Sequence, residues 1–320
     1  MGDAAAFEVV TRRVPTAYFL GVTTGKSLSR RMFPRWAEIL GLGDAQLIGV
    51  DLPINGPPAV YRKAVYQIRH DPLSLGAIIT THKINTLNAA RDLLDDLTPE
   101  ARLTEEVSAI YKRNGRLVGH ATDPSASGQA MAQFVPKGYW RRTGAHILCL
   151  GAGGSAVAIA VHLTQALPAD DRPARVVFVN RSRPRLESLQ QLIVGKLAGS
   201  GIAFEFVENS APRVNDRLMA ALPPGSMVIN ATGMGKDTPG SPITDDGVFP
   251  QDGIAWELNY RGELDFLRQA RAQAAQRNLT VEDGWYYFLV GWSTIIGQIF
   301  EVEITPAIFE RLARAAAELR

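Results

Sequence analysis

Two charged residues that follow apolar segments have the chemistry to move a proton. Lys83 comes soon after the run "LGAIIT" (75–80), and Asp123 directly follows "GRLVGHAT" (115–122). A lysine beyond the carboxyl end of a strand faces the side on which open α/β sheets bind ligands. A carboxylate within hydrogen-bond reach would orient its ammonium and bias proton transfer. We predict Lys83 as a proton-transfer residue with Asp123 as its partner; a solvated surface lysine is the alternative.

A second segment has the residues to hold phosphate. "HILCLGAGGSAVAIAVHL" (146–163) combines a strand, a glycine-rich turn and a helix. Its G-x-G-x-x-G/A spacing allows a tight turn, close approach of a pyrophosphate and close packing of helix on strand. The helix N-terminus favours anions. The segment predicts a dinucleotide site, with a purely structural turn as the alternative, on Gly151, Ala152, Gly153, Gly154, Ser155 and Ala156.

The next strand, "VVFVN" (176–180), indicates which dinucleotide binds. NAD enzymes usually carry Asp or Glu at the end of this strand. Asp170 and Asp171 precede the strand and so belong to its wrong end. Two guanidiniums and a hydroxyl suit a 2′-phosphate, which needs charge-assisted donors. The end of this strand therefore predicts NADP rather than NAD. The alternative is that its two arginines belong to a solvated loop. The predicted residues are Asn180, Arg181, Ser182 and Arg183.

The elements that must position these residues alternate between strands and helices. Three apolar strands between 17 and 80 are separated by two helical segments, which is typical of a parallel sheet covered by helices. Asn114-Gly115 predicts a hairpin, so this sheet should end in an antiparallel pair. Five further strands follow between 145 and 259, and two helices close the chain. We predict an α/β protein with domains 1–123 and 124–285.

Composition excludes several classes of protein. The 320 residues are 46% hydrophobic and 21% charged, as in soluble globular proteins. The net charge of +2 includes no basic tail or polybasic run, which argues against nucleic acid and anionic membrane as partners. The sequence shows no signal peptide and no run of ~18 apolar residues, so we expect a cytoplasmic protein. The scattered histidines lack ligand spacing, so no metal site is expected.

The chain resembles the shikimate and quinate dehydrogenase family over almost its whole length. "TTHK" and "GRLVGHATD" are similar to the family's "TIPHK" and "GRLxGxNTD", which implies a catalytic Lys83 with Asp123 as partner. "GVTTGKSLSRRMF" resembles the segment with the S-x-S substrate motif, which falls on Ser27 and Ser29. "LGAGGSA", "NRS" and "VINATGMG" resemble the cofactor turn, the NADP clamp and the nicotinamide-side loop. The last of these motifs falls on Thr232, Gly233 and Met234.

The same resemblance implies an arrangement of domains. "ELNYRGELDFL" and "EDGWYYFLVGW" are similar to the family's closing segments. An N-terminal α/β substrate domain is then followed by a Rossmann-type NADP-binding domain, and residues 286–320 return to the first domain.

Several polar positions of the family carry other residues in this chain. The asparagine and threonine before the lysine fall on Ala77 and Ile79, and the asparagine of "NTD" falls on Ala121. The glutamine near the C-terminal helix falls on Gly291. The family's "P" in "TIPHK" and the asparagine of "VNT" become Thr81 and Ser108. We therefore predict a substrate site, altered from that of the family, on Ser27, Ser29, Thr81 and Ser108.

Together these features predict an NADP(H)-dependent oxidoreductase. It would interconvert a secondary alcohol and a ketone on a small cyclic polyol or hydroxy acid, as a monomer or homodimer. An authentic shikimate 3-dehydrogenase is the alternative within this class. A non-catalytic NADP-binding sensor is the alternative outside it, and it has no need of the proton relay that Lys83 and Asp123 would form.

Overall fold

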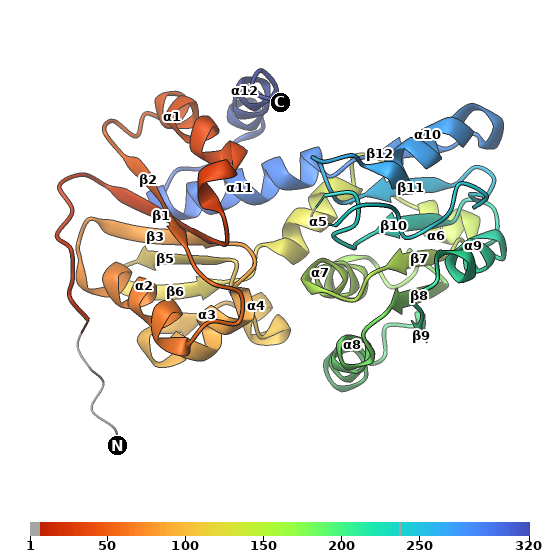
Figure 1. Cartoon of the computed structure of the whole chain (residues 1–320), viewed down its shortest axis with the longest axis horizontal. Helices are drawn as coiled ribbons and strands as arrows, with labels where there is room; N and C mark the ends of the chain where they lie inside the picture. The colour runs from red at the N-terminus through yellow and green to blue at the C-terminus, as the bar shows by residue number, and fades with distance from the viewer. Residues whose placement is uncertain (1–6, 237) are drawn as a thin grey trace. The chain divides into compact units, whose positions relative to one another are not determined.

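The computed structural model describes residues 7–236 and 238–320, which divide into two units (Figure 1). Unit 1 comprises the described residues up to Thr122 together with Leu289–Arg320, and unit 2 comprises Asp123–Phe288. Each unit contains a six-stranded sheet with helices around it. The predicted α/β class is confirmed.

The sheet of unit 1 is parallel apart from one strand. Its strands are β1 (Thr16–Gly21), β2 (Gln46–Asp51), β3 (Ser74–Ile79), β4 (Asp96–Leu97), β5 (Ala109–Arg113) and β6 (Arg116–His120). Their order is β2-β1-β3-β5-β6-β4, and β5 runs antiparallel to β3 and β6. The predicted hairpin is confirmed, because Asn114 and Gly115 have positive φ angles of 50° and 73°, as a type I′ turn requires.

The helices of unit 1 come from both ends of the chain. They are α1 (Leu28–Leu40), α2 (Pro58–His70), α3 (Lys83–Ala90), α4 (Pro99–Thr104) and α12 (Pro306–Ala317), with 3₁₀ turns η1 (Thr24–Lys26) and η2 (Arg91–Leu93). Helix α11 (Trp285–Phe300) begins in unit 2 and ends in unit 1. The buried Trp36 of α1 donates its indole N–H to the carbonyl of Leu312 in α12 at 3.0 Å. The C-terminal helix therefore packs on the first helix of the chain.

Core packing fixes the end of β3 that precedes Lys83. β3 lies between β1 and β5, so two neighbours set its register. Ala77 and Ile79 are buried in an apolar cluster that also contains Leu20 and Leu87. The segment that follows β3 is thereby held at the carboxyl edge of the sheet.

The sheet of unit 2 is entirely parallel. Its strands are β7 (Ile147–Leu150), β8 (Arg175–Asn180), β9 (Ala203–Glu208), β10 (Met227–Asn230), β11 (Ile254–Glu257) and β12 (Thr280–Glu282). Their order is β12-β11-β10-β7-β8-β9, so the direction of winding reverses between β7 and β10. This doubly wound topology binds ligands outside the carboxyl ends of the strands at that switch point.

Several helices of the described chain accompany this sheet. They are α5 (Asp123–Met131), α6 (Tyr139–Thr143), α7 (Gly154–Val161), α8 (Arg183–Lys196), α9 (Pro212–Ala220) and α10 (Asp265–Arg277). A π-helical turn, η3 (His162–Ala166), continues α7. Helix α5 approaches it closely, because a Cβ on Gly128 would lie 2.2 Å from Nδ1 of His162. In the part of the chain that the structure describes, no helix is long and apolar enough to span a bilayer.

Candidate functional site

Lys83 is the first residue of α3 and lies just beyond β3. Its side chain is 18% exposed, and its Nζ is 3.8 Å from Oε1 of Glu106, whose side chain is 5% exposed. The N–H of Val107 donates to the carbonyl of Lys83 at 3.5 Å, which holds the segment before β5 against the first turn of α3. The preceding His82 is buried, with its ring 5.3 Å from that of Tyr61. Lys83 is thus a largely buried lysine with a carboxylate neighbour.

The four predicted substrate residues lie at the same edge of the unit 1 sheet. Ser27 follows β1 and caps α1, and its hydroxyl is 2.7 Å from that of the buried Ser29. Thr81 follows β3 and is exposed. Ser108 is buried and its hydroxyl accepts the N–H of Thr122 at 2.7 Å. Ser27 and Thr81 are therefore the more accessible hydroxyls of the set.

The positions at which the family carries other polar residues are apolar and internal here. Ala77 and Ala121 are fully buried, and Ile79 is 1% exposed. Gly291 is partly buried within α11. Asp123 is partly buried as the first residue of α5, and it belongs to unit 2. Its partnership with Lys83 stays a prediction.

The glycine-rich turn joins β7 to α7 in unit 2, next to the switch point. Gly151 has a φ of 129°, and a Cβ on it would lie 2.5 Å from the carbonyl oxygen of Ala231. Only glycine fits there. Among the described residues, a Cβ on Gly153 would meet nothing nearer than Nη1 of Arg185 at 3.9 Å, so the backbone is open to a phosphate. Ala156 is fully buried, as close packing of α7 on the sheet requires.

A pocket in unit 2 contains most of the predicted cofactor residues. It is lined by Gly151, Ala152, Gly153, Asn180, Arg181, Thr232, Gly233 and Met234. Gly154, Ser155, Ala156, Ser182 and Arg183 are not among its lining residues. The first three begin α7, and Ser182 is the N-cap of α8. The turn, the end of β8 and the segment after β10 therefore form a single site.

The arginine that accompanies Arg181 in this pocket is Arg185. Arg183 is 72% exposed in its side chain and donates from Nε to Glu187 at 3.0 Å, one turn along α8. This bond raises the pKa of Arg183. Arg185 lines the pocket instead. Arg181 precedes the N-cap Ser182 and Arg185 lies in the first turn of α8, so the pocket takes one arginine from each side of the start of this helix.

A buried glutamate organises the segment that follows β10. Glu257 is fully buried at the end of β11 and accepts hydrogen bonds from the side chain of Asn230 and from the backbone and side chain of Asn259. Asn230 in turn accepts the N–H and hydroxyl of Thr232, and Asn259 donates to the carbonyls of Thr232 and Met234. Burial raises the pKa of Glu257 to about 7, against the opposing effect of these donors. The network fixes two of the predicted nicotinamide-side residues.

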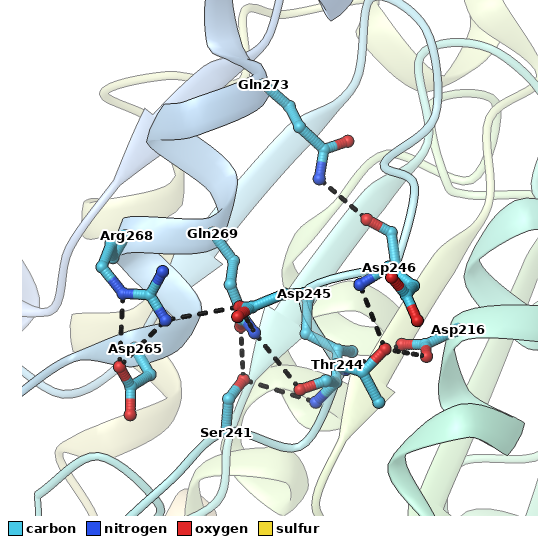
Figure 2. A network of polar contacts seen from close by, with 11 residues as sticks. Asp216, Ser241, Thr244, Asp245, Asp246, Asp265, Arg268, Gln269 and Gln273 are labelled. Carbon is cyan, nitrogen blue, oxygen red and sulfur yellow. Dashed lines mark hydrogen bonds and ion pairs between the residues drawn. The ribbon is translucent and has the colours of Figure 1, made fainter.

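A second polar network surrounds Pro242, which forms part of the pocket wall (Figure 2). Pro242 lines the pocket and its carbonyl accepts a hydrogen bond from Asn215 at 2.7 Å. On either side of Pro242, Ser241 donates to Gln269 of α10, and Thr244 donates twice to Asp216 of α9. The segment 241–247 is thereby tied to two helices. No sequence motif indicated this wall.

The described residues offer no cluster of metal ligands. Within residues 7–236 and 238–320, no three His, Cys, Asp or Glu side chains lie close enough together to hold a metal ion. The single Cys149 is fully buried in β7, and burial raises the pKa of its thiol.

Comparison with known proteins identifies the family. No protein-family model matches the chain. A shikimate dehydrogenase (NADP(+)) of Symbiobacterium thermophilum is 33% identical over 218 residues, which cover 67% of this chain and 68% of the relative. This chain belongs to the shikimate dehydrogenase family.

Solved structures of shikimate dehydrogenases have the same fold. The enzyme of Thermus thermophilus, in complex with NADP(H) and shikimate, superposes with a TM-score of 0.68 at 25% identity, covering 94% of this chain and 99% of that one. A 5-ketofructose reductase of a Gluconobacter species superposes with a TM-score of 0.67 at 21% identity, covering 96% and 99%. The shikimate dehydrogenase fold predicted from the motifs is thus confirmed.

Proposed function

We propose that this member of the family is an NADP(H)-dependent dehydrogenase that interconverts a secondary alcohol and a ketone. Its substrate is a small cyclic polyol or hydroxy acid other than shikimate. The observation that carries the proposal is the pocket of unit 2, where an open glycine turn and two guanidiniums face one site in a chain related to NADP enzymes.

The cofactor assignment follows from the donors in that pocket. The glycine turn and the N-terminus of α7 suit the pyrophosphate. Arg181 and Arg185 suit the 2′-phosphate, while no carboxylate stands among the described residues that line the pocket to hold a ribose 2′-hydroxyl. Bound NADP(H) supplies or accepts the hydride.

The chain itself supplies the proton transfer and the positioning of the substrate. Lys83 exchanges a proton with the substrate oxygen, and Asp123 orients it. Ser27 and Thr81 offer hydroxyls to the substrate at the edge where Lys83 lies. A non-catalytic NADP sensor is disfavoured, because it has no need of a lysine that is largely buried beside a carboxylate.

The altered substrate rests on the replaced polar positions. Ala77, Ile79 and Ala121 are apolar and buried, so they offer no hydrogen bond to a ring hydroxyl. A buried polar group of the ligand that finds no partner costs about 1–3 kcal/mol. An authentic shikimate dehydrogenase remains the second candidate, since Lys83, Ser27 and Ser29 match the family motifs.

Fluorescence titration with NADPH and NADH tests the cofactor assignment. Charge-assisted hydrogen bonds contribute about 1.5–3 kcal/mol each, so NADPH should bind ten- to several-hundred-fold more tightly than NADH. Arg181→Ala and Arg185→Ala should each reduce this preference by about tenfold or more. Arg183→Ala is the matched control and should leave it unchanged. Equal affinities of the unaltered protein for NADPH and NADH would refute the assignment.

A further inference from the structure

The segment before β5 carries a carboxylate that the sequence motifs do not account for. Glu106 is 4% exposed and lies two residues before Ser108, at the carboxyl edge of β1 and β3. Its neighbour Glu105 is exposed, with a φ of 54°. The two adjacent glutamates thus differ sharply in environment, and the inner one faces Lys83 at 3.8 Å.

Because Glu106 is buried, its contact with Lys83 matters electrostatically. Removing a carboxylate from water costs several kcal/mol unless an opposite charge compensates. At 3.8 Å the two atoms form an ion pair but not a hydrogen bond. The ammonium of Lys83 can therefore compensate the charge of Glu106 through space, without a direct hydrogen bond between these two atoms. The contact lies wholly within unit 1.

The surrounding backbone keeps the two side chains together. The Val107 N–H bonds to the Lys83 carbonyl, and the Ser108 carbonyl accepts the N–H of Ile79 at 2.8 Å. The two residues that follow Glu106 are thus bonded to the start of α3 and to the end of β3. The carboxylate is held in place by the same elements that place the lysine.

We propose that Glu106 is a positioning residue for Lys83: it keeps the lysine in its ammonium form and fixes the direction of its side chain. The proposal rests on the proton-transfer role proposed above for Lys83. It adds a carboxylate from unit 1 to the partner that the motifs indicate at Asp123.

Chemical labelling of Lys83 tests this without substrate or cofactor. Acetic anhydride acylates only neutral amines, and an opposite charge within about 4–6 Å favours the ammonium form by about ten- to a thousandfold. The protein is labelled in short pulses at fixed pH, and mass spectrometry measures the labelling of Lys83 relative to that of the exposed Lys63. This ratio reports the fraction of Lys83 that carries a neutral amine. Glu106→Gln should raise this ratio by about tenfold or more. Glu105→Gln is the matched control and should leave it unchanged.

Conservative replacement separates charge from packing. Glu106→Asp keeps the carboxylate, so its ratio should rise less than that of Glu106→Gln, yet measurably, because the shorter side chain weakens the pair. An unchanged ratio in Glu106→Gln, or equal rises in both variants, would overturn the proposal. If Glu106→Gln does not fold, an unchanged ratio in Glu106→Asp would overturn it. Failure here leaves the dehydrogenase assignment intact, because that assignment is tested separately by the NADPH titration.

Discussion

Burial sets Lys83 apart from a surface lysine. The side chain of Lys83 is largely buried beside Glu106, whereas Lys63 on α2 is exposed. The motif "TTHK" indicated this lysine, but no motif indicated its neighbour Glu106. Similarly, the sequence indicated an arginine clamp on Arg181 and Arg183, but only the structure shows that Arg185 lines the pocket and that Arg183 does not.

Removing the amine of Lys83 should abolish most of the catalysis and little else. Lys83→Ala should lower turnover by about 10²–10⁴, because general acid–base groups contribute that much. NADPH affinity should not change, since the cofactor pocket lies in unit 2. Steady-state kinetics on the best substrate and fluorescence titration measure the two quantities. Lys63→Ala is the control, and full activity of Lys83→Ala would mean that another group moves the proton.

The glycine turn between β7 and α7 requires glycine at one position and tolerates a side chain at another. Gly151→Ala would force a side chain onto a φ of 129° and against the Ala231 carbonyl. We expect a loss of roughly 2 kcal/mol or more in the free energy of unfolding. Gly153 has an ordinary extended backbone with open space at its Cβ, so Gly153→Ala should be nearly neutral for stability.

The variants Gly151→Ala and Gly153→Ala together distinguish an effect on stability from an effect on cofactor binding. The methyl group of Gly153→Ala would point into the pocket where we propose that the pyrophosphate binds, so NADPH affinity should fall by about tenfold or more in a folded protein. Thermal unfolding and NADPH titration of both variants give the answer. A Gly153→Ala protein that binds NADPH normally would show that the turn does not approach the phosphates.

The network on β11 makes stability depend on pH. Glu257 has a pKa of about 7 in the folded protein against 4.5 as its ordinary value. Between these values the folded state retains a proton that the unfolded state has lost. Protonated Glu257 therefore contributes roughly 3 kcal/mol to the free energy of unfolding below its ordinary pKa of 4.5. This contribution is lost as the pH rises through about 7.

Urea unfolding from pH 5 to 8 measures this dependence. The unaltered protein should lose stability with rising pH relative to Glu257→Gln, which cannot titrate. Glu263→Gln, at an exposed site, should follow the unaltered protein. Parallel curves for the unaltered protein and Glu257→Gln would mean that Glu257 stays charged throughout.

At the scale of the whole molecule, the sequence predicted the strands that have strong patterns and missed those that do not. The apolar runs of β3 and β8 and the Asn114-Gly115 turn are local signals, and all three predictions are confirmed. The two-residue β4 and three-residue β12 are too short to show a period, so only pairing with neighbours reveals them. The wall around Pro242 depends on contacts with α9 and α10, which are distant in sequence.

The substrate site, too, could be predicted from the sequence only in part. The motifs indicated Ser27, Ser29 and Ser108, but burial shows that the hydroxyl of Ser108 is engaged with Thr122 inside unit 1. Replacement of polar family positions by Ala77 and Ile79 could be read from the sequence, and both side chains are packed in the core. The predicted monomer or homodimer stays a prediction.

We propose that this chain keeps the chemistry of its family but not the family's usual substrate. Steady-state oxidation of shikimate under saturating NADP⁺ tests it most directly. Two or three unpaired polar groups at about 1–3 kcal/mol each should lower the catalytic efficiency on shikimate by roughly 10²–10⁵ relative to a matched enzyme. We therefore expect weak or undetectable turnover. An efficiency of about 10⁴ M⁻¹s⁻¹ or more, the ordinary range for enzymes, would contradict this account and identify an authentic shikimate dehydrogenase.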